Sequence, residues 1–149
     1  MGVPLRLLAI DDNPVDLELT ELVFQQLHVP VQVSTFESGE DALLALRAPH
    51  AALPDVILLD LNMPRMPGLE VLRTLKADPA LRHIPVVILS TSRHPTDVEQ
   101  AYALQASGYL QKQVSFPDFE QQASAFATYW LAQLQPHSPP SWQQPRWDV

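Results

Sequence analysis

The most constraining feature of the sequence is an uninterrupted apolar run that ends in a carboxylate. Residues 56–59 are all Val, Ile or Leu, and they are followed by Asp60 and then by Leu61, Asn62, Met63 and Pro64. A short continuous run rich in branched side chains is typical of a strand buried on both faces of a parallel sheet. Open parallel sheets bind ligands at the carboxyl ends of their strands, so Asp60 is expected at the edge where such a protein carries out its chemistry.

Apolar runs of this kind alternate with helical patterns five times along the chain. Strands are expected at residues 5–10, 31–36, 56–59, 85–89 and 108–110, and helices after residues 13, 38, 68, 95 and 115. Such alternation predicts an α/β fold, with a doubly wound, five-stranded parallel sheet, five helices and right-handed crossovers. We expect this domain to cover residues 1–135, and the segment 136–149, rich in Pro, Ser and Gln, to form a flexible tail.

Several expected helices begin at residues that are good helix caps. Asn13 precedes Pro14, and Ser38 stands three residues before Asp41, which resembles a capping box. Ser115 is expected to cap the last helix, with Pro117 in its first position. In the first helix, helical spacing relates five apolar residues that we expect to face the core: Val15, Leu19, Leu22, Val23 and Leu27.

The composition narrows the class of protein. Hydrophobic residues make up 46% of the 149, which argues against general disorder. The net charge is -8 and no basic patch is present, so direct binding to nucleic acid is not expected. The chain has no cysteine, no signal-peptide pattern and no apolar span long enough to cross a membrane. We therefore expect a cytoplasmic protein without membrane contact.

Polar side chains end most of the expected strands. Asp11 and Asp12 follow the first strand, Asp60 the third and Ser90 the fourth, and Lys112 comes after the fifth. Because the strands are parallel, these side chains are expected at one edge of the sheet. Clustered carboxylates repel one another unless a cation lies among them, and oxygen ligands without cysteine favour a hard cation, most plausibly Mg²⁺. A cation, a hydroxyl and an ammonium around a carboxylate predict a site for phosphoryl transfer, with Asp60 as the nucleophile.

These residues, in this order and spacing, resemble the receiver domain of two-component response regulators, especially the stand-alone chemotaxis type. The motifs that carry the resemblance are Asp11-Asp12, residues 60–64 with Gly68, Ser90, Tyr109 and Lys112. The resemblance implies the flavodoxin-like receiver fold and a histidine kinase as the phosphoryl donor. It also leads us to expect a homodimer through the last two helices and the last strand.

The resemblance assigns a role to each matching residue. Asp60 is the expected phosphoacceptor, and Lys112 is expected to pair with the phosphoryl oxygens. Ser90 is expected to swing toward the phosphoryl group and Tyr109 to follow it inward, which shifts the population between two surface states. The expected ligands of Mg²⁺ are Asp12, Asp60 and the backbone carbonyl of Asn62, with Asp11 acting through water.

The expected output of the domain is a surface, because no output domain follows the last helix. On this view the chain is not an enzyme beyond promoting its own phosphorylation and dephosphorylation. The loop at residues 48–54 and the aromatic end of the last helix at residues 128–131 are similar to those of the small response regulators that accompany phytochrome kinases. That similarity implies a phytochrome kinase as the partner.

One departure from the family pattern lies directly after Lys112. The family usually has Pro after the lysine, joined by a cis bond, whereas this chain has Gln113. A cis bond before a non-proline residue costs about 3 kcal/mol, so we predict a trans bond and a changed loop after Lys112. Two other functions stay open: an aspartyl-phosphate phosphatase of the haloacid dehalogenase type, which should have a carboxylate where this chain has Asn62, and a receiver-like scaffold that is not phosphorylated.

Overall fold

The computed structural model describes residues 3–134 and shows one parallel sheet covered by helices on both faces. The elements follow in the order β1 (Leu5–Ile10), α1 (Pro14–Gln26), β2 (Val31–Phe36), α2 (Gly39–Arg47), β3 (Val56–Leu59), α3 (Gly68–Ala77), β4 (Val86–Ser90), α4 (Pro95–Ala103), β5 (Gly108–Gln111) and α5 (Phe116–Leu134). All strand pairs are parallel, and the strand order is β2-β1-β3-β4-β5. The predicted five-stranded, doubly wound α/β fold is confirmed.

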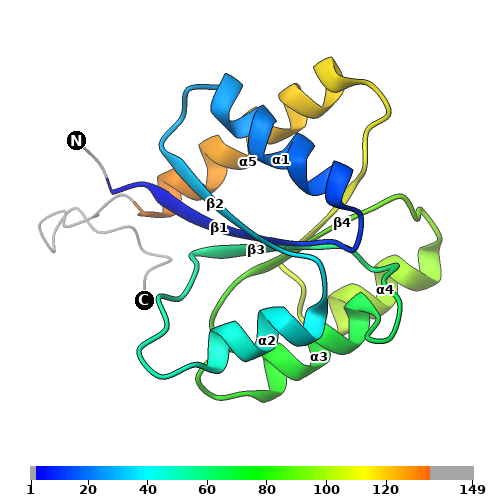
Figure 1. Cartoon of the computed structure of the whole chain (residues 1–149). Helices are drawn as coiled ribbons and strands as arrows, with labels where there is room; N and C mark the ends of the chain where they lie inside the picture. Colours follow the sequence, from blue (N-terminus) through cyan, green and yellow to red (C-terminus); the bar gives the residue numbers. More distant parts are fainter. Residues whose placement is uncertain (1–2, 135–149) are drawn as a thin grey trace, which may run out of the picture.

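The two faces of the sheet carry two separate cores. Helices α1 and α5 pack on one face, and α2, α3 and α4 pack on the other (Figure 1). Strand β3 lies in the middle and is buried on both sides, since Ile57 and Leu59 belong to one core while Val56 and Leu58 belong to the other. This double burial is the reason why the sequence of β3 is continuously apolar instead of alternating.

Side-chain caps set the start of three helices. The Oδ1 of Asn13 accepts hydrogen bonds from the backbone N–H groups of Val15 and Asp16, at 3.0 and 3.4 Å. Ser38 caps α2 and Ser115 caps α5 in the same way, with hydrogen bonds of 3.1 and 3.2 Å. The three predicted caps are therefore confirmed, although α5 begins at Phe116, so that Pro117 takes the second position instead of the first.

The predicted core face of α1 is wrong for three of its five residues, whereas Val23 is fully buried and Leu27 is partly buried against the same core. The buried residues are Leu17, Thr20, Val23 and Phe24, whereas Val15, Leu19 and Leu22 are exposed. Thr20 fits the buried face because its hydroxyl donates to the carbonyl of Asp16 at 2.9 Å. The helix has apolar residues on more than one face, so spacing alone did not determine which face packs against α5 and the sheet.

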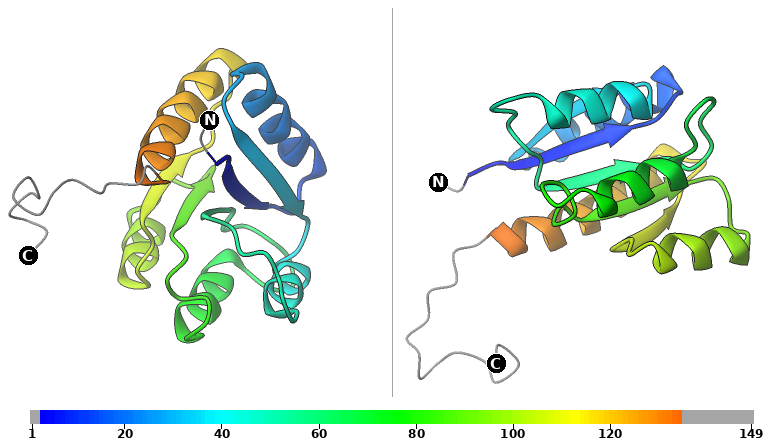
Figure 2. Two further views of the ribbon diagram at one scale, coloured as in Figure 1. Left: turned by 90° about the vertical axis from the view of Figure 1, so that its left-hand side faces the viewer. Right: turned by 90° about the horizontal axis from the view of Figure 1, so that it is seen from below.

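Helices α4 and α5 flank β5, which forms one edge of the sheet; the views in Figure 2 show this arrangement from two further directions. Of the apolar residues of α4, only Ala101 is fully buried, and Tyr102 is exposed. No helix in the described part of the chain has the length and apolar character needed to cross a membrane. The predicted tail at residues 136–149 lies outside the described residues.

Candidate functional site

Three carboxylates meet where β1 and β3 end. The two strands pair in register up to Ile10 and Leu59, and the backbone N–H of Asp60 donates to the carbonyl of Ile10 at 3.0 Å. Because the strands end side by side, one carboxylate oxygen from each of Asp11, Asp12 and Asp60 lies within 4.8 Å of the others. Asp11 and Asp60 are buried, while Asp12 is exposed. The prediction that these side chains converge is confirmed.

The donor set of this cluster fits a hard divalent cation. All three side chains offer carboxylate oxygens, which are the ligands that Mg²⁺ prefers in proteins. Solvent reaches the cluster through exposed Asp12, so that a cation could keep several of its waters. The residues that would hold the cation are Asp11, Asp12 and Asp60, together with the backbone carbonyl expected from Asn62. Such a cation would neutralise negative charge on a phosphoryl group beside Asp60.

The surroundings of Asp60 disfavour its charged form. Burial raises the pKa of Asp60 to about 6 from its ordinary value of 3.8, and the negative charge of Asp11 adds to this effect. Lys112 and a backbone hydrogen bond from Asn62 act in the opposite direction without cancelling it. This agrees with the repulsion expected among clustered carboxylates and gives the site a physical reason to attract a cation.

Lys112 follows the end of β5 and reaches the cluster from a distant part of the chain. Its Nζ lies 2.7 Å from Oδ2 of Asp11, 2.8 Å from Oδ2 of Asp16 and 3.7 Å from Oδ1 of Asp60. Burial alone would lower the pKa of Lys112, but the hydrogen bonds to Asp11 and Asp16 raise it above its ordinary value. The ammonium therefore stays protonated and is the cation that this site already contains.

The bond after Lys112 is trans, as predicted, since no cis peptide bond occurs among residues 3–134. The backbone N–H of Lys112 donates to the carbonyl of Ser90 at 2.8 Å, which fixes the start of the loop. The Nε2 of Gln113 donates to the carbonyl of Gln111 at 3.1 Å. The replacement of the usual proline by Gln113 thus leaves the side chain of Lys112 within reach of the carboxylates.

Ser90 and Tyr109 are linked through the loop that follows β4. Ser90 is fully buried, and its Oγ accepts hydrogen bonds from the backbone N–H of Ser92 at 3.2 Å and from Nδ2 of Asn62 at 3.5 Å. The hydroxyl of Tyr109 donates to the carbonyl of Ser92 at 2.9 Å. The backbone of Ser92 therefore contacts both residues of the expected switch, a role that the sequence had not predicted.

Gly68 lets the first turn of α3 lie directly against the end of β3. Its N–H donates to the carbonyl of Leu61 at 2.9 Å. A Cβ at this position would lie only 2.1 Å from the carbonyl oxygen of Asp60 and 2.7 Å from Cα of Leu61. Any residue larger than glycine would therefore push on the backbone that carries the expected phosphoacceptor.

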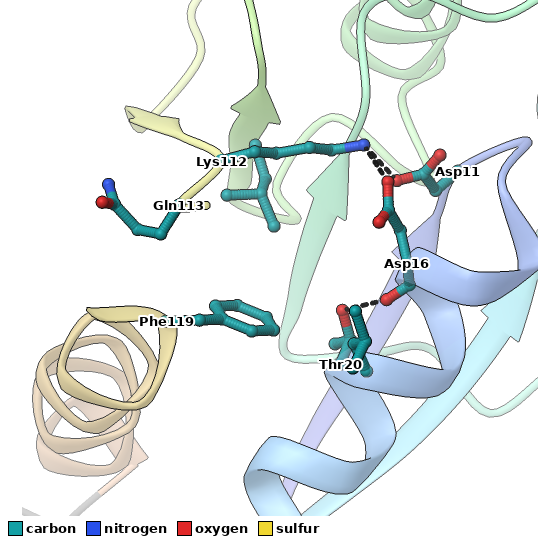
Figure 3. A pocket seen from close by; sticks show the side chains of 8 residues that line it. Asp11, Asp16, Thr20, Lys112, Gln113 and Phe119 are labelled. Atoms are coloured by element: carbon teal, nitrogen blue, oxygen red, sulfur yellow. Dashed lines mark hydrogen bonds and ion pairs between the residues drawn. The ribbon is translucent and has the colours of Figure 1, made fainter. Parts of the chain in front are cut away.

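Asp16 is the residue of this site that sequence reasoning missed. It lies in the first turn of α1, and its carboxylate is a hydrogen-bond partner of Lys112 (Figure 3). The two residues are 96 positions apart in the chain, so no local pattern connects them. The only available signal was an acidic residue one helical turn after Asp12, at the same edge of the sheet.

Comparison with known proteins identifies the family. The family model of the response regulator receiver domain matches residues 7–124. The chain belongs to this family. Among curated relatives, response regulator Rcp1 of Synechocystis sp. is 31% identical over 132 residues, which cover 86% of this chain and 90% of Rcp1. The probable methanogenesis regulatory protein FilR2 of Methanothrix harundinacea is 34% identical, with 86% of this chain and 84% of that protein covered.

Solved structures of response regulators share the fold of this receiver domain. The phosphorylated cyanobacterial phytochrome response regulator RcpA is 34% identical, with a TM-score of 0.81 and coverage of 88% of this chain and 96% of that one. The Mn²⁺-bound form of Rcp1 is 30% identical, with a TM-score of 0.78 and coverage of 93% and 100%. The flavodoxin-like receiver fold and the similarity to phytochrome-associated response regulators are thus confirmed.

Proposed function

We propose that this receiver domain accepts a phosphoryl group on Asp60 from a histidine kinase, in a step that depends on Mg²⁺. The observation that carries the proposal is the convergence of Asp11, Asp12, Asp60 and Lys112 at one edge of the sheet. Four charged groups from three distant segments meet there, and two of the three carboxylates, Asp11 and Asp60, are buried. This arrangement suits a residue that must alternate between a free carboxylate and an acyl phosphate.

The residues of the site divide the work of the transfer. A carboxylate oxygen of Asp60 attacks phosphorus, the bond from phosphorus to the imidazole nitrogen of the kinase histidine breaks, and that nitrogen keeps the electron pair. Lys112 neutralises phosphoryl oxygens as they approach, because its ammonium is already 3.7 Å from Asp60. Water later attacks the phosphorus, the bond from phosphorus to the Asp60 oxygen breaks, and inorganic phosphate leaves the regenerated carboxylate. In this proposal the chain catalyses no other reaction.

The proposed signal leaves the site through Ser90 and Tyr109. Ser90 lies at the end of β4, where its hydroxyl can donate to a phosphoryl oxygen, and Ser92 connects it with Tyr109 on β5. A shift of this loop changes the surface formed by α4, β5 and α5. We propose that this surface mediates formation of a homodimer in the cytoplasm, and that the kinase is a phytochrome, as the similarity to RcpA suggests.

The proposal is tested by exposing the full chain to acetyl phosphate and Mg²⁺ and measuring the mass of the intact protein. The wild type is expected to gain one phosphoryl group, and Asp60→Ala is expected to gain none. Asp55→Asn serves as the matched control, because Asp55 directly precedes β3, at the end of the strand opposite to Asp60. Its carboxylate accepts a hydrogen bond from the backbone N–H of Arg6. An unmodified wild type supports the scaffold alternative, and steady hydrolysis of a generic phosphomonoester supports the phosphatase; either contradicts the proposal.

A further inference from the structure

The ammonium of Lys112 is shared unequally among three carboxylates. Its two short contacts, of 2.7 and 2.8 Å, go to Asp11 and Asp16 (Figure 3). Asp60 is farther away, at 3.7 Å. Two of its three N–H donors are therefore engaged before any phosphoryl group arrives. Lys112, which is expected to assist Asp60, is thus held by Asp11 at the end of β1 and by Asp16 on α1.

Unlike Asp11, Asp16 does not belong to the cluster of carboxylates that could hold a cation in the described part of the chain. That cluster consists of Asp11, Asp12 and Asp60. Asp16 is instead fixed in the first turn of α1, where Asn13 accepts a hydrogen bond from its backbone N–H at 3.4 Å. Its side chain is 34% exposed against 17% for Lys112, so the pair is only partly screened by solvent. A divalent cation would offset the charge of Asp11, whereas the charge of Asp16 would still face Lys112.

Lys112 also has room to move. A cavity of about 50 Å³ lies between α1, α5 and the loop after β5. It is lined on its polar side by Asp11, Asp16 and Lys112, and Phe119 of α5 closes it on another side (Figure 3). The side chain of Lys112 therefore borders open space on the side that it shares with Asp16, and is not packed tightly there.

We propose that Asp16 is a positioning residue that holds Lys112 in the unphosphorylated protein and releases it when a phosphoryl group on Asp60 takes its ammonium. This inference rests on the proposed function of the site. The two anions compete for one ammonium, so Asp16 stabilises the unphosphorylated state relative to the phosphorylated state. Removing its charge favours the phosphorylated state by linkage.

The test compares Asp16→Asn with the wild type in binding of beryllofluoride, a phosphoryl analogue, at saturating Mg²⁺, followed by ¹⁹F NMR. The variant loses the charged hydrogen bond between Asp16 and Lys112, which is partly screened by solvent. It is therefore expected to bind beryllofluoride roughly three- to tenfold more tightly. Asp16→Glu, which keeps the charge, should stay closer to the wild type. Equal or weaker binding by Asp16→Asn would overturn the inference.

Two controls separate the action through Lys112 from a general effect of charge. Glu18→Gln removes one negative charge from an exposed position of the same helix and is expected to leave the affinity unchanged. In a Lys112→Ala background, Asp16→Asn is expected to have no further effect on beryllofluoride binding. A persistent gain in that background would assign the effect to the field of Asp16 and would refute its role as a partner of Lys112.

A third measurement needs no cation. Urea unfolding in EDTA of the wild type, Asp16→Asn, Lys112→Ala and the double variant is expected to show a favourable coupling between the two positions. No coupling would contradict the contact itself. The inference and the proposed function fail differently: if wild type does not bind beryllofluoride, the proposed function fails, whereas binding that is indifferent to Asp16 refutes only the inference.

Discussion

Asp60 combines burial with like charge, and its state therefore depends on pH. Its side chain is only 7% exposed, and its raised pKa of about 6 means that folding favours the protonated carboxyl over the carboxylate. The stabilising effect of protonation is complete below the unfolded pKa of 3.8 and is lost as the pH rises through about 6. A charged Asp60 at neutral pH thus destabilises the fold as long as no cation offsets its charge.

The first prediction follows from the upward shift of the pKa of Asp60. In EDTA at pH 7.5, Asp60→Asn is expected to be more stable than the wild type, because it removes a carboxylate whose charge folding disfavours. Because the pKa of Asp60 is raised from 3.8 to about 6, the wild type should regain about 2 kcal/mol relative to the variant between pH 7.5 and pH 4. The measurement is urea unfolding of both proteins across that range.

Adding Mg²⁺ provides the internal check for this pH series. A cation among the carboxylates stabilises the charged form of Asp60, so the difference between the two proteins should shrink at pH 7.5 and depend less on pH. A difference that stays constant from pH 7.5 to pH 4 in EDTA would show that burial does not shift the titration of Asp60 in the direction given above.

The helices show how far local sequence determines an element. The starts of α1, α2 and α5 were predictable because Asn13, Ser38 and Ser115 cap them through contacts within three residues along the chain. The core face of α1 was not, because its sequence offers apolar side chains in several directions and packing against Phe126 of α5 selects Phe24. Local signals thus set where a helix begins, and tertiary contacts set its rotation.

The second prediction tests that rotation. Leu17 of α1 is 5% exposed and Leu22 is 41% exposed. Leu17→Ala is expected to lower the free energy of unfolding by about 2–4 kcal/mol, since it leaves a cavity between α1 and the sheet, whereas Leu22→Ala is expected to cost less than about 1 kcal/mol. Urea unfolding of the two matched variants measures the difference. The reverse order would restore the face that spacing alone predicted.

The site was predictable to the extent that the sheet topology determines it. Once parallel strands were expected, Asp11, Asp12 and Asp60 had to meet at one edge, and the structure places them there. The pairing of Lys112 with Asp16 was not predictable, because it depends on how a side chain from the loop after β5 crosses to the start of α1. Backbone topology fixes which residues share an edge, while side-chain packing decides which of them pair.

At the scale of the whole molecule, the two helix layers leave β5 at one edge of the sheet between α4 and α5 (Figure 2). Tyr102 of α4 and Val114 of the loop between β5 and α5 are large, exposed apolar residues. Tyr109 of β5 is connected through Ser92 to Ser90 at the end of β4. This face therefore combines exposed apolar surface with a structural link to the site, which is what an output surface requires.

The third prediction is that this face forms the homodimer. Tyr102→Asp and Val114→Asp each place a charge in the proposed interface and are expected to raise its dissociation constant roughly tenfold or more, by the usual cost of disrupting a central apolar contact. Leu44→Asp is the matched control, because Leu44 is an exposed apolar residue of α2. This helix follows β2, which forms the opposite edge of the sheet from β5. Sedimentation velocity with and without beryllofluoride measures the association. If the wild type stays monomeric in both conditions, or if Leu44→Asp disrupts the dimer equally, the face between α4 and α5 is not the dimer interface, and the signal must leave the site by another surface.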